Sequence, residues 1–231
     1  MERINLEDYD TDKGHNYIKF YEAFFYPYRF STVSVLELGM HRGGSMRIWR
    51  DYFPHGKIFG VDINPVDIPD DHRIFTYQGD ATNRAFLDSI YKDHNVALFD
   101  LIIDDASHLG HDARKSFEML FRDHLAPGGL YVVEDWGTGY MPDWPDGARY
   151  GEYDVSHQQA EGLKSKLMRR KPDTPASPSA GHGAGMVGFV KSLVDHVGGP
   201  DIRAWGGDIE DWGIEYVTYT PGLVFMKKRA G

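Results

Sequence analysis

The chain contains no cysteine, which excludes disulfides, thiolate-bound zinc and cysteine nucleophiles, so any metal must bind to oxygen or imidazole ligands. It also lacks an apolar run of the roughly 18 residues that a membrane-spanning helix requires. The first residues carry no apolar signal-peptide core, and we therefore expect a cytoplasmic protein with no membrane partner.

Basic residues are the minority among the charged side chains. Lysine and arginine number 25 against 35 acidic residues, which gives a net charge of −10. A field of this sign repels phosphate backbones, so we expect a small molecule rather than a nucleic acid as the partner. The length of 231 residues suits a single domain that spans residues 1–231.

Short apolar runs alternate with helical patterns over the first 134 residues. Runs rich in β-branched residues predict strands at 33–38, 57–62, 74–78, 99–104 and 130–134. Apolar residues at helical spacing predict helices at 45–53, 84–92 and 113–125. Near-continuous apolar strands separated by helices indicate a parallel sheet that helices cover on both faces.

The carboxyl-terminal part has a different pattern. A predicted helix at 186–197 precedes strands at 215–220 and 223–227, and the short Pro221-Gly222 turn requires these two strands to be antiparallel. The whole pattern predicts a doubly wound, Rossmann-like α/β sheet, mostly parallel with an antiparallel carboxyl-terminal strand. It is closer to the S-adenosylmethionine (SAM) methyltransferase variant than to a nicotinamide-binding domain. The long aperiodic stretch at about 137–185 predicts an insertion or lid.

Glycines follow the first predicted strand, which ends at Glu37-Leu38-Gly39 and leads into Gly43-Gly44-Ser45. Such a turn lets the backbone approach a ligand at the amino terminus of the next helix. The pattern is not Gly-x-Gly-x-x-Gly, because Met40 and His41 stand where a pyrophosphate-binding turn needs glycine, and this disfavours a dinucleotide.

Acidic residues end the following strands. Asp62 ends the second, where an acid can accept hydrogen bonds from both hydroxyls of a ribose, and Asp80 ends the third, where it can contact an adenine amino group. Each alone could be a helix cap or a solvated loop acid. Together they indicate a nucleoside cofactor, with candidate contacts at Glu37, Gly39, Gly43, Ser45, Asp62, Asp80 and Asp104.

Four carboxylates close the fourth and fifth strands, in Asp104-Asp105 and Glu134-Asp135. That much negative charge needs a cation, and hard oxygen ligands suit Mg²⁺. We therefore predict Asp105, Glu134 and Asp135 as metal ligands, with pairing to arginine or lysine as the alternative.

His108 lies three residues beyond Asp105 and is the candidate general base. A metal-bound alcohol loses its proton more easily, and imidazole titrates near neutral pH, so Asp105 and His108 are the predicted catalytic pair. In the predicted insertion, Tyr140, Trp144 and Tyr150 offer flat faces for a sugar ring or polyketide, although aromatic residues in such loops also serve as plain packing.

Five motifs together resemble the magnesium-dependent sugar O-methyltransferases of macrolide biosynthesis, the mycinamicin and tylosin type. They are Thr11-Asp12-Lys13-Gly14-His15-Asn16-Tyr17, Leu36-Glu37-Leu38-Gly39, Trp49-Arg50-Asp51-Tyr52-Phe53-Pro54, Asp104-Asp105-Ala106-Ser107-His108 and Val133-Glu134-Asp135-Trp136.

The resemblance implies methyl transfer from SAM to a sugar hydroxyl of a natural product. It places Mg²⁺ on Asp105, Glu134 and Asp135, a base at His108, and Asp12 and Lys13 along or over the cofactor pocket. Alternatives are a non-sugar hydroxyl such as a phenol, a cephalosporin-hydroxylase-like tailoring protein, and a non-catalytic SAM-binding subunit. A homo-oligomer is compatible with all of these.

Overall fold

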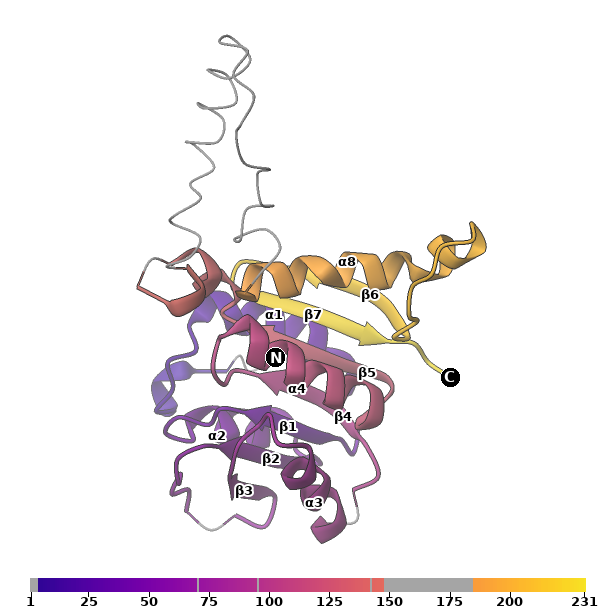
Figure 1. Cartoon of the computed structure of the whole chain (residues 1–231). Helices are drawn as coiled ribbons and strands as arrows, with labels where there is room; N and C mark the ends of the chain where they lie inside the picture. The colour runs from indigo at the N-terminus through magenta and orange to yellow at the C-terminus, as the bar shows by residue number, and fades with distance from the viewer. Residues whose placement is uncertain (1–3, 70, 95, 142, 148–184) are drawn as a thin grey trace.

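The computed structural model describes residues 4–69, 71–94, 96–141, 143–147 and 185–231. In this part of the chain seven strands form one sheet in the order β3-β2-β1-β4-β5-β7-β6 (Figure 1). The strands are β1 Ser34–Leu38, β2 Lys57–Asp62, β3 Ile74–Gln78, β4 Phe99–Asp104, β5 Leu125–Glu134, β6 Ile214–Tyr219 and β7 Leu223–Lys228.

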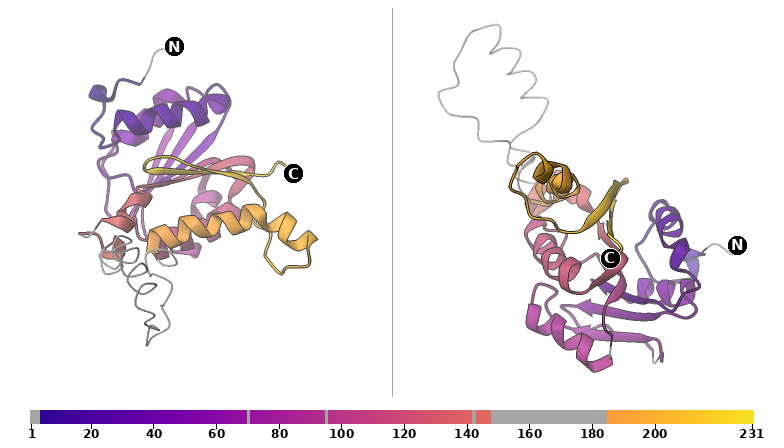
Figure 2. Two further views of the ribbon diagram at one scale, coloured as in Figure 1. Left: turned by 90° about the horizontal axis from the view of Figure 1, so that it is seen from above. Right: turned by 90° about the vertical axis from the view of Figure 1, so that its right-hand side faces the viewer.

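Helices cover both faces of the sheet (Figure 2). On one face α1 and α2 pack over a core that includes Tyr21, Phe25 and Trp49, and on the other α3, α4 and α8 pack over a core that includes Leu87 and Phe117. The helices are α1 His15–Phe25, α2 Gly44–Tyr52, α3 Arg84–His94, α4 Gly110–Asp123 and α8 Gly185–Ala204, with short 3₁₀ turns η1 Leu6–Asp8, η2 Tyr26–Tyr28 and η3 Trp136–Tyr140.

The pairing directions confirm the predicted fold class. Strands β1 to β5 pair in parallel, whereas β7 is antiparallel to both β5 and β6. The central strand β1 is buried on both faces, with Val35 in one core and Leu36 in the other. None of the described helices combines the length and apolar character needed to cross a membrane.

Besides boundary shifts of up to three residues, as in α4, which spans Gly110–Asp123 instead of 113–125, three elements differ from the sequence-based expectation. Helix α1 was not predicted, although Ile18, Tyr21 and Phe25 give it a buried face at helical spacing. Strand β5 begins at Leu125 rather than 130, and the pairing with β4 shifts register between Phe99 and Leu101, where the Pro-Gly-Gly segment interrupts the ladder. Helix α8 runs to Ala204 with Pro200 inside it, instead of ending near 197.

Candidate active site

A cavity of about 380 Å³ lies beyond the carboxyl ends of β1, β2, β3 and β4, and we call it the strand-end cavity. Four of the predicted cofactor residues line it, namely Gly39, Asp62, Asp80 and Asp104. They meet here because the carboxyl ends of adjacent parallel strands share one edge of the sheet, where ligands of open α/β sheets bind.

Gly39 is required by the close approach of two strand ends. Its φ is +85°, and a Cβ there would lie 2.2 Å from the carbonyl oxygen of Asp105. The Gly39 amide donates to the carbonyl of Val61 at 2.7 Å, which fixes the turn on the neighbouring strand. Any other residue would push β1 away from β4 and change the floor of the strand-end cavity.

Asp62 and Asp80 also hold the backbone around this cavity. Oδ2 of Asp62 accepts hydrogen bonds from the amides of Met40 at 2.9 Å and His41 at 3.1 Å. Oδ1 of Asp80 accepts from the amide and hydroxyl of Thr82 at 2.7 and 2.8 Å, and these bonds lower the pKa of Asp80. Both acids are therefore pre-positioned as hydrogen-bond acceptors at the cavity wall.

Asp104 is buried at the end of β4. Burial raises the pKa of Asp104 to about 7, although a hydrogen bond from the Tyr131 hydroxyl, 3.0 Å from Oδ2, opposes the rise. A carboxyl with this pKa is partly protonated near neutral pH and can donate as well as accept a hydrogen bond in the cavity.

The other predicted cofactor residues do not line the strand-end cavity. Gly43 precedes α2 with φ +78°, and Ser45 donates its hydroxyl to Oε2 of Glu37 at 2.7 Å. Glu37 is fully buried and also accepts from the Trp49 indole at 3.2 Å. These three residues are absent from the lining of the strand-end cavity, and their contact with a cofactor stays a prediction.

A second cavity of about 260 Å³, the carboxylate cavity, opens beside the first and includes Asp105, Glu134 and Asp135 in its lining. Lys13 reaches into it from the amino-terminal segment. Its Nζ lies 2.7 Å from Oδ2 of Asp105 and 3.1 Å from Oε1 of Glu37, and it also pairs with Glu134. The ammonium of Lys13 thus lies among acids, and the position of Lys13 along or over the cofactor pocket stays a prediction.

Two tyrosines of α1 bind the acids of this cavity, and neither had a predicted role. The Tyr21 hydroxyl donates to Oε1 of Glu134 at 2.5 Å, and the Tyr17 hydroxyl donates to Asp135. Burial and the nearby charge of Asp105 raise the pKa of Glu134 to about 8 against the opposing effect of Lys13. The spacing of Ile18, Tyr21 and Phe25 was the available signal for this helix.

His108 follows β4 in a left-handed conformation with φ +53°. Its Nε2 lies 3.9 Å from Oδ1 of Asp105 and 3.8 Å from Oδ2 of Asp135. The His108 carbonyl accepts hydrogen bonds from the Thr138 hydroxyl at 3.1 Å and the Trp144 indole at 3.2 Å. These contacts fix the loop so that the imidazole faces the two carboxylates.

The donor atoms are arranged in two overlapping groups that could hold a cation. Asp105, His108 and Asp135 each offer one ligand atom within 4.8 Å of the others, and so do Glu37, Asp105 and Glu134. The second group surrounds Lys13, whereas the first is partly exposed. The carboxylate oxygens suit a hard divalent cation such as Mg²⁺, so the His108 imidazole need not be a ligand and can act as a base. Glu134, predicted as a ligand, is buried and bound by Lys13 and Tyr21.

The model of the FtsJ-like methyltransferase family matches residues 17–134, just over half of the chain. The matched range runs from α1 to the end of β5 and includes every strand that lines the strand-end cavity. The chain belongs to the FtsJ-like methyltransferase family.

Two curated relatives of this FtsJ-like methyltransferase are named as O-methyltransferases. The mycinamicin VI 2''-O-methyltransferase of Micromonospora griseorubida is 42% identical over 135 residues, which are 55% of this chain and 33% of that protein. The 8-demethyl-8-alpha-L-rhamnosyl tetracenomycin-C 2'-O-methyltransferase of Streptomyces olivaceus is 33% identical over 226 residues, which are 94% of this chain and 51% of that protein. The chain therefore spans a third to a half of their lengths.

Among solved structures, the MycE methyltransferase from the mycinamycin biosynthetic pathway, in complex with Mg and SAH, is similar to this FtsJ-like methyltransferase with a TM-score of 0.70. The two are 31% identical, and the match covers 99% of this chain and 56% of that one. The shared fold thus includes the antiparallel carboxyl-terminal strands as well as the family-matched core.

The two ends of the insertion of this FtsJ-like methyltransferase meet at Asp146. Oδ2 of Asp146 accepts hydrogen bonds from the amides of Gly110 at 2.7 Å and Met186 at 2.8 Å, close to the amino termini of α4 and α8. A Cβ on Gly110 would lie 1.9 Å from the carbonyl carbon of Gly185, so the two helix starts touch. The sequence analysis assigned Asp146 no role.

The three aromatic residues that were predicted to bind the acceptor differ in their positions. The Trp144 ring is 5.8 Å from the His108 ring, which places it at the candidate base. Tyr140 is 38% exposed and its ring lies 6.0 Å from that of Trp136. Tyr150 and most of the predicted insertion, residues 148–184, lie outside the described residues.

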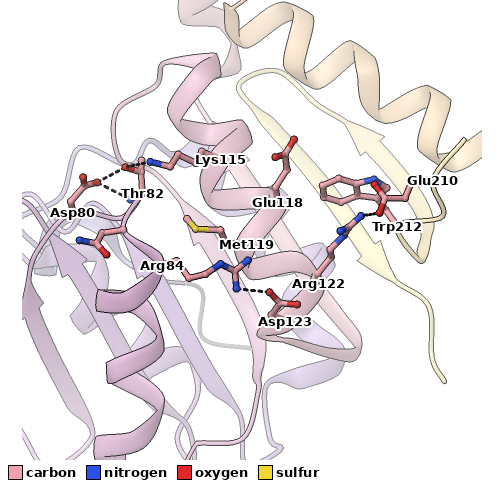
Figure 3. Close-up of a pocket in the computed structure, with 11 residues that line it drawn as sticks. Asp80, Thr82, Arg84, Lys115, Glu118, Met119, Arg122, Asp123, Glu210 and Trp212 are labelled. Atoms are coloured by element: carbon pink, nitrogen blue, oxygen red, sulfur yellow. Dashed lines mark hydrogen bonds and ion pairs between the residues drawn. The ribbon is translucent and has the colours of Figure 1, made fainter.

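A groove of about 840 Å³ lies on the outer side of α3 and α4 of the FtsJ-like methyltransferase (Figure 3). Asp80 and Thr82 belong to both this groove and the strand-end cavity. Arg84 pairs with Asp123 at 2.6 Å, and Arg122 pairs with Glu210. Because cations and acids of the groove neutralise one another, it lacks the single-sign charge that would indicate a ligand.

Proposed function

We propose that the protein is a SAM- and Mg²⁺-dependent O-methyltransferase that acts on a hydroxyl of a sugar attached to a natural product. The observation that carries this proposal is the position of Asp105, His108 and Asp135 at the sheet edge directly beside the strand-end cavity. The names of the curated relatives support a sugar hydroxyl as the acceptor, and MycE in complex with Mg and SAH supports the pair of cofactors.

The strand-end cavity is the proposed SAM site. Gly39 allows the backbone to approach the ligand, Asp62 offers an acceptor for ribose hydroxyls, and Asp80 offers one for the adenine amino group. Asp104 lines the same cavity beside the acid pair of the neighbouring site. Positioning is the main requirement of this reaction, because the attacking oxygen, the methyl carbon and the sulfur must lie in line.

In the proposed reaction, the acceptor oxygen forms a bond to the methyl carbon of SAM. The carbon–sulfur bond breaks, its electron pair stays on sulfur, and the hydroxyl proton passes to Nε2 of His108. Asp105 and Asp135, 3.9 and 3.8 Å from that nitrogen, orient the imidazole and stabilise its protonated form. A divalent cation held by Asp105, Asp135 and, once freed from Lys13, Glu134 would lower the pKa of the bound hydroxyl.

The proposal is tested with purified protein, SAM and two acceptors taken from the relatives' names, mycinamicin VI and 8-demethyl-8-rhamnosyl-tetracenomycin C. We expect a calorimetric binding isotherm for SAM and a singly methylated product by mass spectrometry. Absence of SAM binding would reject the proposal. Methyl transfer that continues in the presence of EDTA would reject only the role of the metal. An oxygenated product would favour the hydroxylase alternative.

A further inference from the structure

Lys13 is the cation that the structure places among the buried carboxylates of Glu37 and Glu134 and the partly exposed carboxylate of Asp105. Its side chain is 2% exposed, and those of Glu37 and Glu134 are 0% and 2% exposed. The Nζ of Lys13 lies 2.7 Å from Oδ2 of Asp105 and 3.1 Å from Oε1 of Glu37, and it also pairs with Glu134, so acids surround the amine. The side chain therefore remains an ammonium ion inside the fold.

The partners of this ammonium are also the predicted partners of a divalent cation. Asp105 presents Oδ2 to Lys13 at 2.7 Å, while its Oδ1 lies 3.9 Å from His108 on the side of the partly exposed donor group. Glu134, the second predicted ligand, is held by Lys13 as well. Two cations that share these oxygens repel each other strongly, because water does not screen charges in a buried site.

Lys13 also belongs to a segment that lies against the turn after β1. The Lys13 amide donates to the Thr11 hydroxyl at 3.2 Å, and a Cβ on Gly44 would lie 1.9 Å from the carbonyl oxygen of Asp10. Residues 10–14 therefore connect the carboxylate cavity to the amino terminus of α2.

We propose that Lys13 is the resident counter-ion of Glu37, Asp105 and Glu134, and that a divalent cation binds there in competition with its ammonium. The inference rests on the metal site of the proposed function and adds a residue that controls its affinity. When the divalent cation arrives, Lys13 withdraws from Asp105 and Glu134, and residues 10–14 shift with it.

The first test is calorimetric titration of the full chain with MgCl₂, comparing wild type with Lys13→Met. Removal of the competing ammonium should tighten Mg²⁺ binding by about tenfold or more. Lys19→Met is the matched control, because Lys19 lies exposed on α1 and its loss changes the net charge equally. It should leave the affinity at the wild-type value.

The results separate this inference from the metal site itself. No Mg²⁺ binding by wild type would overturn both. If wild type binds Mg²⁺ and Lys13→Met binds it equally or more weakly, only the competition is overturned. Weaker binding is what the loss of a lysine that merely orients the ligands would produce. If Lys13→Met does not fold in EDTA, Lys13→Gln, which retains a hydrogen-bond donor, is titrated in its place with the same criteria.

A second measurement uses wild-type protein alone. Acetic anhydride acetylates accessible, deprotonated lysines, so Lys13 should be almost unreactive in EDTA because it is buried and paired with three acids. Adding MgCl₂ should raise its acetylation severalfold by mass spectrometry, while exposed Lys19 reacts equally in both buffers. Equal acetylation of Lys13 with and without Mg²⁺ would contradict its withdrawal.

Discussion

Replacing Asp146 tests whether one carboxylate holds together the amino termini of α4 and α8. Asp146→Ala removes two hydrogen bonds to backbone amides, at 2.7 Å and 2.8 Å. Charge-assisted bonds of this kind contribute about 1.5–3 kcal/mol each, and Asp146 is only half-buried, so we expect a loss of about 3 kcal/mol in the free energy of unfolding. In a protein of this size the melting temperature should fall by about 6–12 °C.

Asp146→Asn separates the hydrogen bonds from the charge. The amide oxygen can still accept both bonds, so the variant loses only the attraction between a carboxylate and two helix amino termini, about 1 kcal/mol in total. Both variants are measured by urea unfolding, and hydrogen exchange of peptides that contain Gly110 and Met186 should accelerate in the alanine variant. Asp143→Ala, at an exposed position of the same segment, is the control. Equal stability of the alanine and asparagine variants would refute the reasoning, as would a loss below about 0.5 kcal/mol in both.

Three further predictions concern the edge of the sheet. His108→Ala should reduce methyl transfer by about a hundredfold or more while calorimetry shows unchanged SAM binding, and unaltered turnover would remove it as the base. Gly39→Ala should lower the free energy of unfolding by about 3 kcal/mol, measured with urea, and abolish SAM binding, because the added Cβ meets the Asp105 carbonyl. Gly137→Ala is the control and should be tolerated, because the space around its Cβ is open. Burial raises the pKa of Asp104 from 3.8 to about 7, so the folded chain binds this proton more tightly than the unfolded chain does. In EDTA, the resulting contribution to the free energy of unfolding should be complete below about pH 4 and should be lost as the pH rises to about 7. Asp104→Asn should lack this decline. If the free energy of unfolding of the two proteins changed in parallel with pH, the assignment of the decline to Asp104 would be wrong.

The sequence predicted the strand ends well because they depend on local pattern. Asp62, Asp80 and Asp104 follow short apolar strands, and in a parallel sheet such ends share one edge whatever packs around them. The antiparallel pairing of β6 with β7 also followed, since the short turn at Pro221-Gly222 leaves no other direction.

The partners of the acids could not be predicted in the same way. Lys13 lies 92 residues before Asp105 and 121 before Glu134, and these contacts exist only once α1 and the preceding segment dock on the sheet. The sequence analysis weighed pairing with a lysine as an alternative to metal binding, and the structure shows this pairing for Asp105 and Glu134. Asp135 pairs instead with Tyr17, which the unpredicted α1 supplies.

His108 and Asp135 share a backbone conformation that only glycine adopts without cost, with φ of +53° and +54°. Conformations of this kind cost about 1–3 kcal/mol per residue. Selection of a mutant library for heat resistance alone should therefore enrich glycine at both positions, whereas selection for product formation should retain histidine and aspartate. The two outcomes would separate what the fold prefers at these loops from what the chemistry requires of them.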